Sequence, residues 1–333
     1  MKKVIVTGGA GFIGSHLTER LVREGHKVTV LDNLVTGRLK NLEAVGKNKN
    51  LSFVKLDITN AGRLNKYFKG ADWVFHLAAL ADIVPSVVTP LKYHHVNVDG
   101  TAAVLEASRK NRVKKFIYTA SSSCYGIPEE YPTNELARIS TEYPYAFTKY
   151  VGECFTFHWA KVYKLPVVSL RLFNVYGPRA RSSGTYGAVI GVFLAQKLTR
   201  KPLTIVGDGR QKRDFVFVTD VVDAFIKAAA SGVKNEIFNV GSGAPQSINR
   251  LAALLGKNKV YIPRRPGEPE CTWADISKIK RCLFWKPSVL LEEGVRRVLE
   301  NITYWKDAPV WTPEKIKKAT KEWFKCISDD GKN

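Results

Sequence analysis

The sequence predicts an α/β fold in which a doubly wound parallel sheet is followed by a smaller C-terminal α/β domain. Strand-like and helix-like segments alternate along most of the chain, as parallel βαβ units require. A glycine-rich segment follows the first strand-like segment directly. With 333 residues, 45% of them hydrophobic, the chain is long enough for one large domain and a smaller partner domain.

Short β-branched and apolar runs predict the strands, and apolar residues at helical spacing predict the helices. The expected strands are 3–7, 27–31, 52–55, 72–76, 114–119, 167–171 and 236–240. The expected helices lie near 12–24, 61–68, 99–111, 143–163, 187–200, 219–231 and 290–303. Proline and glycine concentrate at 177–187 and 262–269, where the sheet pattern lapses and binding loops are expected.

The first strand ends in a glycine-rich turn that runs from Gly8 to Gly14. Glycines permit a tight turn and the close approach of a pyrophosphate, whose charge then lies at the N-terminus of the next helix. The second strand ends at Asp32, eighteen residues beyond Gly14, where a carboxylate would bind the ribose hydroxyls of adenosine. This spacing predicts a Rossmann site for NAD rather than NADP, whose 2′-phosphate would meet a negative charge. The alternative is an ordinary polar turn at Asp32 and Asn33.

Tyr145 and Lys149 lie four residues apart in an expected helix, so the phenol and the ammonium share one helix face. A free tyrosine ionises near pH 10, and a neighbouring positive charge is needed to make it a proton acceptor at neutral pH. The hydroxyl cluster of Ser121, Ser122 and Ser123 stands upstream at the end of an expected strand. The spacing alone is common by chance, but together with the glycine turn it predicts a proton-transfer site.

The chain is strongly basic, with 52 Lys and Arg against 30 Asp and Glu and a formal net charge of +22. Such a charge is compatible with a nucleic-acid or anionic-membrane partner. However, the cations are spread over the whole length, and there is no basic arm or Arg-rich tail. We therefore expect a solvated, lysine-rich surface and no nucleic-acid partner.

The five cysteines are scattered, without CxxC or His-x-x-x-His spacing, which favours reduced thiols and no metal site. No stretch approaches the length of a membrane span. Residues 2–7 are typical of a core strand rather than of a signal sequence. These observations predict a cytoplasmic protein with no membrane partner.

Several motifs in this order resemble the extended short-chain dehydrogenase/reductase family, and more narrowly its NAD-dependent UDP-sugar 4-epimerases. The resemblance covers about residues 2–300 and is less clear beyond them. The motifs are Thr7-Gly8-Gly9-Ala10-Gly11-Phe12-Ile13-Gly14, Asp32, His76-Leu77-Ala78-Ala79, Ser121-Ser122-Ser123-Cys124-Tyr125-Gly126, Tyr145-x-x-x-Lys149 and Arg171-Leu172-Phe173-Asn174-Val175-Tyr176-Gly177-Pro178.

The resemblance implies a set of residues that bind NAD. Gly8, Gly11 and Gly14 would hold the pyrophosphate, while Asp32 would bind the adenosine ribose and Asp57 the adenine. The other implied cofactor positions are Phe12, Ile13, Asn33, Ile58, Leu77, Ala78, Ala79, Tyr145 and Lys149.

The resemblance also implies that Ser121, Tyr145 and Lys149 are catalytic. Tyr145, as a phenolate stabilised by Lys149, would take the proton of the sugar C4 hydroxyl while hydride passes from C4 to NAD. Ser121 would hydrogen-bond the same oxygen. The resulting 4-keto sugar would turn, held only by its nucleotide, and regain the hydride on its opposite face, so that C4 inverts.

The implied substrate is a UDP-hexose or a UDP-N-acetylhexosamine. Its implied binding residues are Ser122, Ser123, Asn174, Ala188, Val189, Arg213, Arg265, Glu268 and Thr272. Arg213 and Arg265 would bind the diphosphate, and Glu268 the uridine ribose. Thr272 and Ala188 are small, which would leave room for an N-acetyl group.

Structural readings compete with these assignments. Ser122 and Ser123 can simply cap the strand end, and Asn174 can be part of the loop. Arg213 and Asp214 can form a surface ion pair, and Thr272 can begin a strand that never meets the sugar. His76 is expected to be a hydrogen-bonded spacer rather than a base.

The resemblance implies that the related dehydratases and decarboxylases carry acidic residues after the catalytic Ser/Thr. Ser122 and Ser123 occupy those positions here and therefore favour an epimerase. Asp82, in the segment after His76, disfavours a carboxylated sugar, although Arg179 or Arg181 would compensate its charge. The alternatives are a UDP-glucuronate 4-epimerase, another nucleotide-sugar dehydratase or reductase, a non-catalytic NAD-binding sensor and a nucleic-acid-associated protein.

The expected domain organisation is an NAD-binding Rossmann domain over 1–173, with later returns near 212–240 and 274–300, and a mainly substrate-binding domain over 174–333. A homodimer is also expected, because helices 99–111 and 143–163 correspond to a four-helix dimer interface in relatives. The apolar residues expected in that interface are Val104, Leu105, Tyr150, Val151, Phe155 and Trp159. The alternative is that they pack on the sheet.

Overall fold

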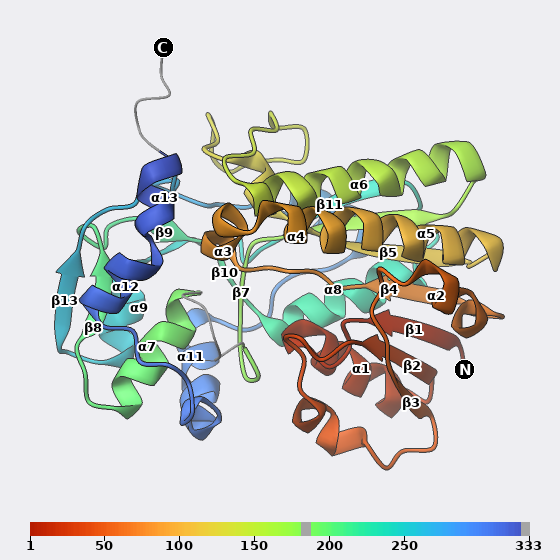
Figure 1. Cartoon of the computed structure of the whole chain (residues 1–333), viewed down its shortest axis with the longest axis horizontal. Coiled ribbons are helices and arrows are strands. Elements are labelled where there is room, and N and C mark those ends of the chain that lie inside the picture. The colour runs from red at the N-terminus through yellow and green to blue at the C-terminus, as the bar shows by residue number, and fades with distance from the viewer. Residues whose placement is uncertain (181–187, 328–333) are drawn as a thin grey trace.

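A computed structural model describes residues 1–180 and 188–327 and confirms the predicted α/β fold. The central sheet has seven strands in the order β11-β6-β5-β4-β1-β2-β3, and Figure 1 shows helices on both of its faces. Its strands are β1 (Lys3–Thr7), β2 (Lys27–Asp32), β3 (Leu51–Lys55), β4 (Trp73–His76), β5 (Lys115–Ser121), β6 (Val167–Leu172) and β11 (Glu236–Val240). All neighbouring strands pair in parallel. The strand order reverses between β1 and β4, the kind of switch point where doubly wound sheets bind ligands.

Two helical layers enclose the sheet. The helices α5 and α6 cover one face, while α1 and α8 cover the other (Figure 1). Their bounds, with that of α2, are α1 (Phe12–Arg23), α2 (Ala61–Phe68), α5 (Gly100–Lys110), α6 (Pro144–Tyr163) and α8 (Val218–Ala230). These helices and the strands lie close to the ranges predicted from apolar periodicity, because strands buried on both faces and amphipathic helices carry the strongest patterns.

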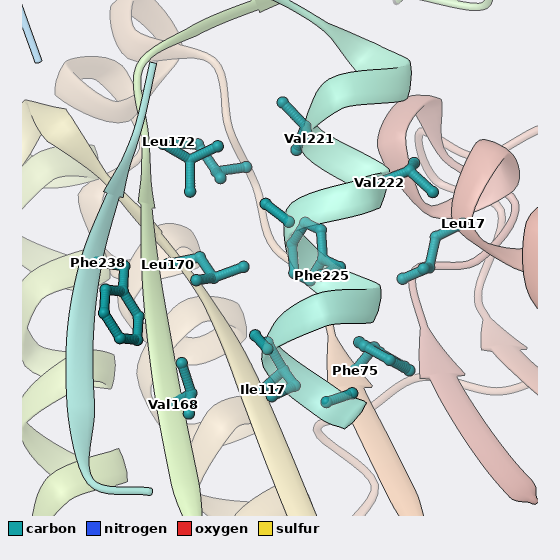
Figure 2. Close-up of a cluster of buried hydrophobic side chains, with 14 of the residues drawn as sticks. Leu17, Phe75, Ile117, Val168, Leu170, Leu172, Val221, Val222, Phe225 and Phe238 are labelled. Atoms are coloured by element: carbon teal, nitrogen blue, oxygen red, sulfur yellow. The ribbon is translucent and has the colours of Figure 1, made fainter. Parts of the chain in front are cut away.

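The core has two layers, one on each face of the sheet, because successive side chains of a strand point to opposite faces. In β1, the side chain of Ile5 packs with α2 and α5, whereas Val4 and Val6 pack with α1 and α8. Figure 2 shows Phe225 of α8 facing the strands, and its ring centre lies 6.1 Å from that of Phe75 in β4. Since both faces bury apolar side chains, the register of the sheet is strongly specified.

The C-terminal half adds three two-stranded sheets and several helices around a second apolar cluster. The paired strands are β7 (Asn174–Tyr176) with β10 (Phe215–Phe217), β8 (Leu203–Val206) with β13 (Lys259–Ile262), and β9 (Lys212–Arg213) with β12 (Gln246–Ser247). The helices are α7 (Val189–Leu198), α9 (Ile248–Leu255), α10 (Ser277–Leu283), α11 (Leu291–Glu300), α12 (Pro313–Ala319) and α13 (Lys321–Cys326). Residue 187, where the first of these helices was expected to begin, lies outside the described residues.

Short helices that the periodicity did not predict connect the larger elements. After β4 the chain forms α3 (Ile83–Val88), α4 (Pro90–His94) and one π-helical turn, η2 (His95–Asp99), before α5 begins. The 3₁₀ helices are η1 (Leu39–Val45), η3 (Ser122–Tyr125) and η4 (Ile302–Trp305). Segments of this length show too few turns for an apolar period to emerge from the sequence.

The expectation that Val104 and Leu105 form a dimer interface is wrong. Both side chains are fully buried beneath α5, where they pack with the core of their own chain. Their apolar spacing is the core-facing stripe of α5, and this is the alternative that the sequence left open. On α6, by contrast, Phe147 is 54% exposed and Val162 is 49% exposed.

Within residues 1–180 and 188–327, no helix is both long and apolar enough to cross a membrane. The same part of the chain contains no group of His, Cys, Asp and Glu residues arranged to hold a metal ion. All five cysteines are free thiols, and Cys124 is buried.

Candidate active site

The predicted catalytic residues lie at the carboxyl end of β5 and on α6. Ser121 ends this strand, and Pro144 begins α6, as proline commonly does at the first position of a helix. The Ser121 hydroxyl hydrogen-bonds the Tyr145 phenol and lies 3.0 Å from the Ser123 hydroxyl. The structure therefore brings Ser121 and Tyr145 into contact and places Lys149 one turn beyond Tyr145 on the same helix.

Burial shifts the pKa values of Tyr145 and Lys149 in opposite directions. Desolvation raises the pKa of Tyr145, which the hydrogen bond from Ser121 partly opposes and the charge of Asp82 reinforces. Desolvation also lowers the pKa of Lys149 to about 7, and Glu153 one turn further along α6 opposes this shift. A lysine with a pKa near neutrality can hold or release a proton at physiological pH, which is typical of a group in an active site.

A buried ion pair fixes the helix that carries these residues. The carboxylate of Glu153 lies 2.6 Å from the guanidinium of Arg171 on β6, and the Ser169 hydroxyl donates to the same carboxylate at 2.6 Å. Arg171 also donates to the Tyr125 hydroxyl at 2.9 Å. The pair ties α6 to the sheet directly behind Lys149. Sequence reasoning quoted Arg171 in a motif but assigned it no partner.

The glycine turn after β1 is closely packed. A Cβ on Gly14 would lie 2.2 Å from the Gly8 carbonyl oxygen, and a Cβ on Gly8 would lie 2.7 Å from the Ala78 amide nitrogen. Gly8 also has a φ of +70°, which a side chain would strain. The structure thus packs Gly8 against Leu77 and Ala78, and it places Gly11 immediately before α1 and Gly14 in its first turn.

Three polar residues predicted to bind the adenosine gather beside this turn. The buried carboxylate of Asp32 accepts the amide hydrogens of Ala10 at 3.0 Å and Leu34 at 2.8 Å. The Asn33 side chain donates to Asp57 at 2.7 Å. The Asp32 carboxylate is therefore buried and held by two backbone amides, one of them two residues further along its own turn. Nearby, Ile58 is buried against Gly100, while Phe12 and Ile13 are partly buried on α1.

His76 is fully buried between two hydroxyl groups. Its Nδ1 lies 2.7 Å from the Thr7 hydroxyl, and its Nε2 lies 2.9 Å from the Thr101 hydroxyl. Desolvation, with a further contribution from Lys149, lowers its pKa to about 3. The imidazole is neutral at physiological pH and both nitrogens are engaged, as expected for a hydrogen-bonded spacer.

Arg213, Arg265 and Glu268 form a second cluster. The Glu268 carboxylate lies 2.7 Å from the guanidinium of Arg265 and 3.9 Å from that of Arg213. Asp214 points elsewhere, because its buried carboxylate accepts backbone hydrogen bonds from Ser242, Gly243 and Ala274. The alternative of a surface ion pair between Arg213 and Asp214 is therefore wrong.

Asn174 and Thr272 are also brought together. The Thr272 hydroxyl donates to the Asn174 side-chain oxygen at 2.8 Å and accepts the Asp214 amide hydrogen at 3.1 Å. Ser122 is half-buried in η3, next to Ser123. Ala188 is exposed and precedes α7, whose first residue, Val189, packs on the second apolar cluster. The neighbouring Arg181, Tyr186 and Gly187 lie outside the described residues.

Tyr143 is a residue that the sequence did not single out. Its hydroxyl hydrogen-bonds Ser123, and its ring is nearly parallel to that of Tyr145, with centres 6.5 Å apart and an interplanar angle of 7°. The charges of Glu268 and Arg213 also act on its phenol. Tyr143 thus lies between the Tyr145 cluster and the Arg265 cluster. The sequence feature that could have pointed to Tyr143 is its position two residues before Tyr145.

A doubly wound sheet with a glycine turn, an acidic residue after β2 and a Tyr-Lys pair on one helix defines an extended short-chain dehydrogenase/reductase. The family comparison agrees with this class: the chain belongs to the NAD dependent epimerase/dehydratase family, whose model matches residues 4–241.

Relatives with known names cover nearly the whole chain. It is 38% identical over 307 residues to the UDP-glucose 4-epimerase of Mycolicibacterium smegmatis, covering 90% of this chain and 97% of the relative. It is 36% identical over 317 residues to the UDP-glucuronate 4-epimerase of Thermodesulfobacterium geofontis, covering 90% and 96%. Among solved structures, the UDP-N-acetylglucosamine 4-epimerase of Methanobrevibacter ruminantium in complex with UDP-N-acetylmuramic acid superposes with a TM-score of 0.85. That structure is 36% identical, and the match covers 91% of this chain and 97% of the other.

Proposed function

We propose that the protein is an NAD-dependent UDP-sugar 4-epimerase, which inverts C4 of a UDP-hexose or a UDP-N-acetylhexosamine. The observation that carries this proposal is the hydrogen bond between Ser121 and Tyr145, with Lys149 one turn further along the same helix. Only serines follow Ser121 in the cluster, so the chain offers no carboxyl group there for elimination or decarboxylation. Named relatives acting on UDP-glucose and on UDP-N-acetylglucosamine support the same reaction.

The glycine turn and Asp32 fit NAD. The absence of Cβ atoms at Gly8 and Gly14 lets the backbone approach a pyrophosphate at the N-terminus of α1. Each carboxylate oxygen of Asp32 accepts one backbone amide hydrogen, so each keeps a further acceptor site for a ribose hydroxyl. NAD bound there supplies the hydride acceptor and donor for C4.

Tyr145, Lys149 and Ser121 then act on the proton of the sugar C4 hydroxyl. Tyr145 takes the proton from the C4 hydroxyl. Because burial raises the pKa of Tyr145, its phenolate form would depend on the positive charges of Lys149 and of the bound nicotinamide. Ser121 donates a hydrogen bond to the same sugar oxygen. Arg213 and Arg265 hold the diphosphate, and Glu268 holds the uridine ribose, so the 4-keto sugar stays bound while it turns. Tyr145 returns the proton when C4 is reduced on its opposite face.

UDP-glucuronate is the second candidate substrate, because one of the relatives is a UDP-glucuronate 4-epimerase. The electrostatics favour an uncharged hexose. Asp82 raises the pKa of Tyr145, so its negative charge acts on the reacting centre and would oppose a second carboxylate. Of the two arginines that would compensate this charge, Arg179 is paired with Glu19 at 2.6 Å and Arg181 lies outside the described residues.

The remaining assignments complete the proposal. Residues 174–333 mainly form the substrate-binding domain, and residues 1–173, with returns near 212–240 and 274–300, form the NAD-binding domain. A homodimer forms through α5 and α6, supported by the exposure of Phe147, Val162 and Tyr163 on α6. The enzyme is cytoplasmic, which its five free cysteines support.

Incubation of the purified protein with UDP-glucose, UDP-N-acetylglucosamine and UDP-glucuronate in separate reactions tests the function. Anomeric proton NMR signals of the galacto-configured products are expected from the first two substrates. Turnover of UDP-glucuronate alone would favour the second candidate. No turnover of any of the three would contradict the proposed function.

A further inference from the structure

Trp323 lies where the C-terminal end of the chain meets the candidate active site. It belongs to α13, which packs against α3 at the end of the molecule opposite the N-terminus (Figure 1). Its side chain is only 1% exposed. Asp82, whose charge acts on Tyr145, immediately precedes α3. Trp323 is therefore buried against an element that borders the site.

Two contacts of Trp323 reach the two halves of the site. Its ring centre lies 5.4 Å from that of Tyr143 at an angle of 49°. Its indole Nε1–H donates a hydrogen bond of 3.0 Å to the carbonyl oxygen of Pro266. Tyr143 hydrogen-bonds Ser123 and lies alongside Tyr145. One buried indole thus contacts both a neighbour of the proposed base and the loop of the second cluster.

The Pro266 carbonyl lies within the loop that the proposed function assigns to the nucleotide. Arg265 and Glu268 flank it and pair with each other at 2.7 Å. The next residue, Gly267, has a φ of +71°, and a Cβ there would lie 2.8 Å from Ile327, which directly follows α13. The loop therefore packs directly on the C-terminal helix, and its conformation depends on that contact.

We propose that Trp323 is a positioning residue that fixes the separation between the nucleotide-binding loop and the proposed base, Tyr145. This inference rests on the proposed function, in which the keto sugar turns while only its nucleotide is held. Small displacements of a bound substrate from its reacting group reduce turnover strongly. The indole holds the loop through its N–H and holds Tyr143 through its ring, so the two roles are separable by mutation.

The substitution W323F tests the contact with the loop, because it keeps an aromatic ring and removes the N–H donor. UDP affinity by calorimetry and the KM for the sugar nucleotide are expected to weaken about three- to tenfold, in line with one lost neutral hydrogen bond, with kcat within about twofold of wild type. The matched control is F324A, at the neighbouring residue on α13, which is 43% exposed. F324A is expected to leave the UDP affinity unchanged. UDP binding by W323F equal to that of F324A would overturn the proposal.

The substitution W323L tests the contact with Tyr143, because it keeps much of the buried volume and removes the ring. It is expected to lower kcat about tenfold below the value for W323F, so that the phenylalanine rescues turnover. Equal kcat values for W323F and W323L would overturn this part of the proposal, whatever their melting temperatures. Failure of the proposed function can be told apart from failure of this inference. In the first case the wild-type protein would turn over no sugar nucleotide, while the UDP affinities of W323F and F324A would still test the contact with the loop.

Discussion

The ammonium nitrogen of Lys149 lies 4.4 Å from the centre of the Tyr118 ring, and the Tyr118 hydroxyl donates to the Lys149 carbonyl oxygen at 2.9 Å. The aromatic ring attracts the charged form of the lysine, yet burial disfavours that form and lowers the pKa to about 7. The close packing extends to Gly152, where a Cβ would lie 2.3 Å from the Tyr118 hydroxyl. The Tyr118 ring therefore holds the buried ammonium of Lys149 in one place, one turn of α6 beyond Tyr145.

The first prediction concerns Lys149→Met in the NAD-free protein. The folded pKa of about 7 is below the usual value, so between pH 7 and 10.5 the unfolded chain binds more protons than the folded chain. The free energy of unfolding of wild type should rise with pH in this window, relative to the variant, by a few kcal/mol. Below pH 7 the full cost of the buried charge is present, and the variant is expected to be the more stable protein.

Urea titrations at pH 6, 8 and 10 measure this difference. Lys161→Met, at an exposed position on the same helix, is the matched control and should track wild type at every pH. A stability difference between Lys149→Met and wild type that stays constant across the three pH values would contradict the lowered pKa.

The second prediction concerns the proposed base. Tyr145→Phe removes one oxygen at the reacting centre and is expected to reduce turnover by about 10²–10⁴-fold, with the fold and the NAD content intact. Ser121→Ala should be severe but milder, since it removes a hydrogen bond to Tyr145 rather than the proton acceptor. NMR assays of turnover, together with absorbance of released NAD, check both variants. A Tyr145→Phe enzyme that kept more than about half of the wild-type rate would exclude Tyr145 as the base.

The sequence predicted the central sheet because its strands are short apolar runs separated by clear helical patterns. The glycine turn, Asp32 and the Tyr-Lys spacing are local signals, and in the structure they lie after β1, at the end of β2 and on α6. Trp323 gave no such signal, because its contact with Tyr143 joins segments far apart in the chain through tertiary packing. The helices near Trp323, α12 and α13, are also short, so they carry little apolar periodicity. The start of α12 does have a local signal, because Thr312 accepts a hydrogen bond from Lys315 and precedes Pro313.

The third prediction concerns the buried ion pair of Glu153 and Arg171. Glu153→Gln keeps the shape but leaves the guanidinium of Arg171 buried without its counter-charge, which should destabilise the fold by about 3–5 kcal/mol. Glu106→Gln is the matched control, because Glu106 pairs with Arg109 on the surface of α5 and should change stability little. Denaturant unfolding at pH 7 measures both. Equal, small losses would show that the buried pair is not needed to hold α6 on β6.

The fourth prediction concerns substrate size at Thr272. The hydroxyl of Thr272 bonds Asn174, which the proposed function also assigns to the sugar site. UDP-N-acetylhexosamines are therefore expected to be turned over alongside UDP-glucose and UDP-galactose. Thr272→Tyr should place a ring where the acetyl group would lie.

Thr272→Tyr also breaks the hydrogen bonds to Asn174 and Asp214, so a loss of activity alone would not report on size. Thr272→Val is the matched control, because it removes the hydroxyl and keeps the volume. The ratio of kcat/KM for UDP-N-acetylglucosamine to that for UDP-glucose should stay near wild type in Thr272→Val. In Thr272→Tyr the same ratio should fall at least about tenfold, since a pocket wall discriminates through the bulk that it excludes. Equal losses for both substrates in Thr272→Tyr would mean that residue 272 does not border the C2 substituent, and that the acetyl group is accommodated elsewhere.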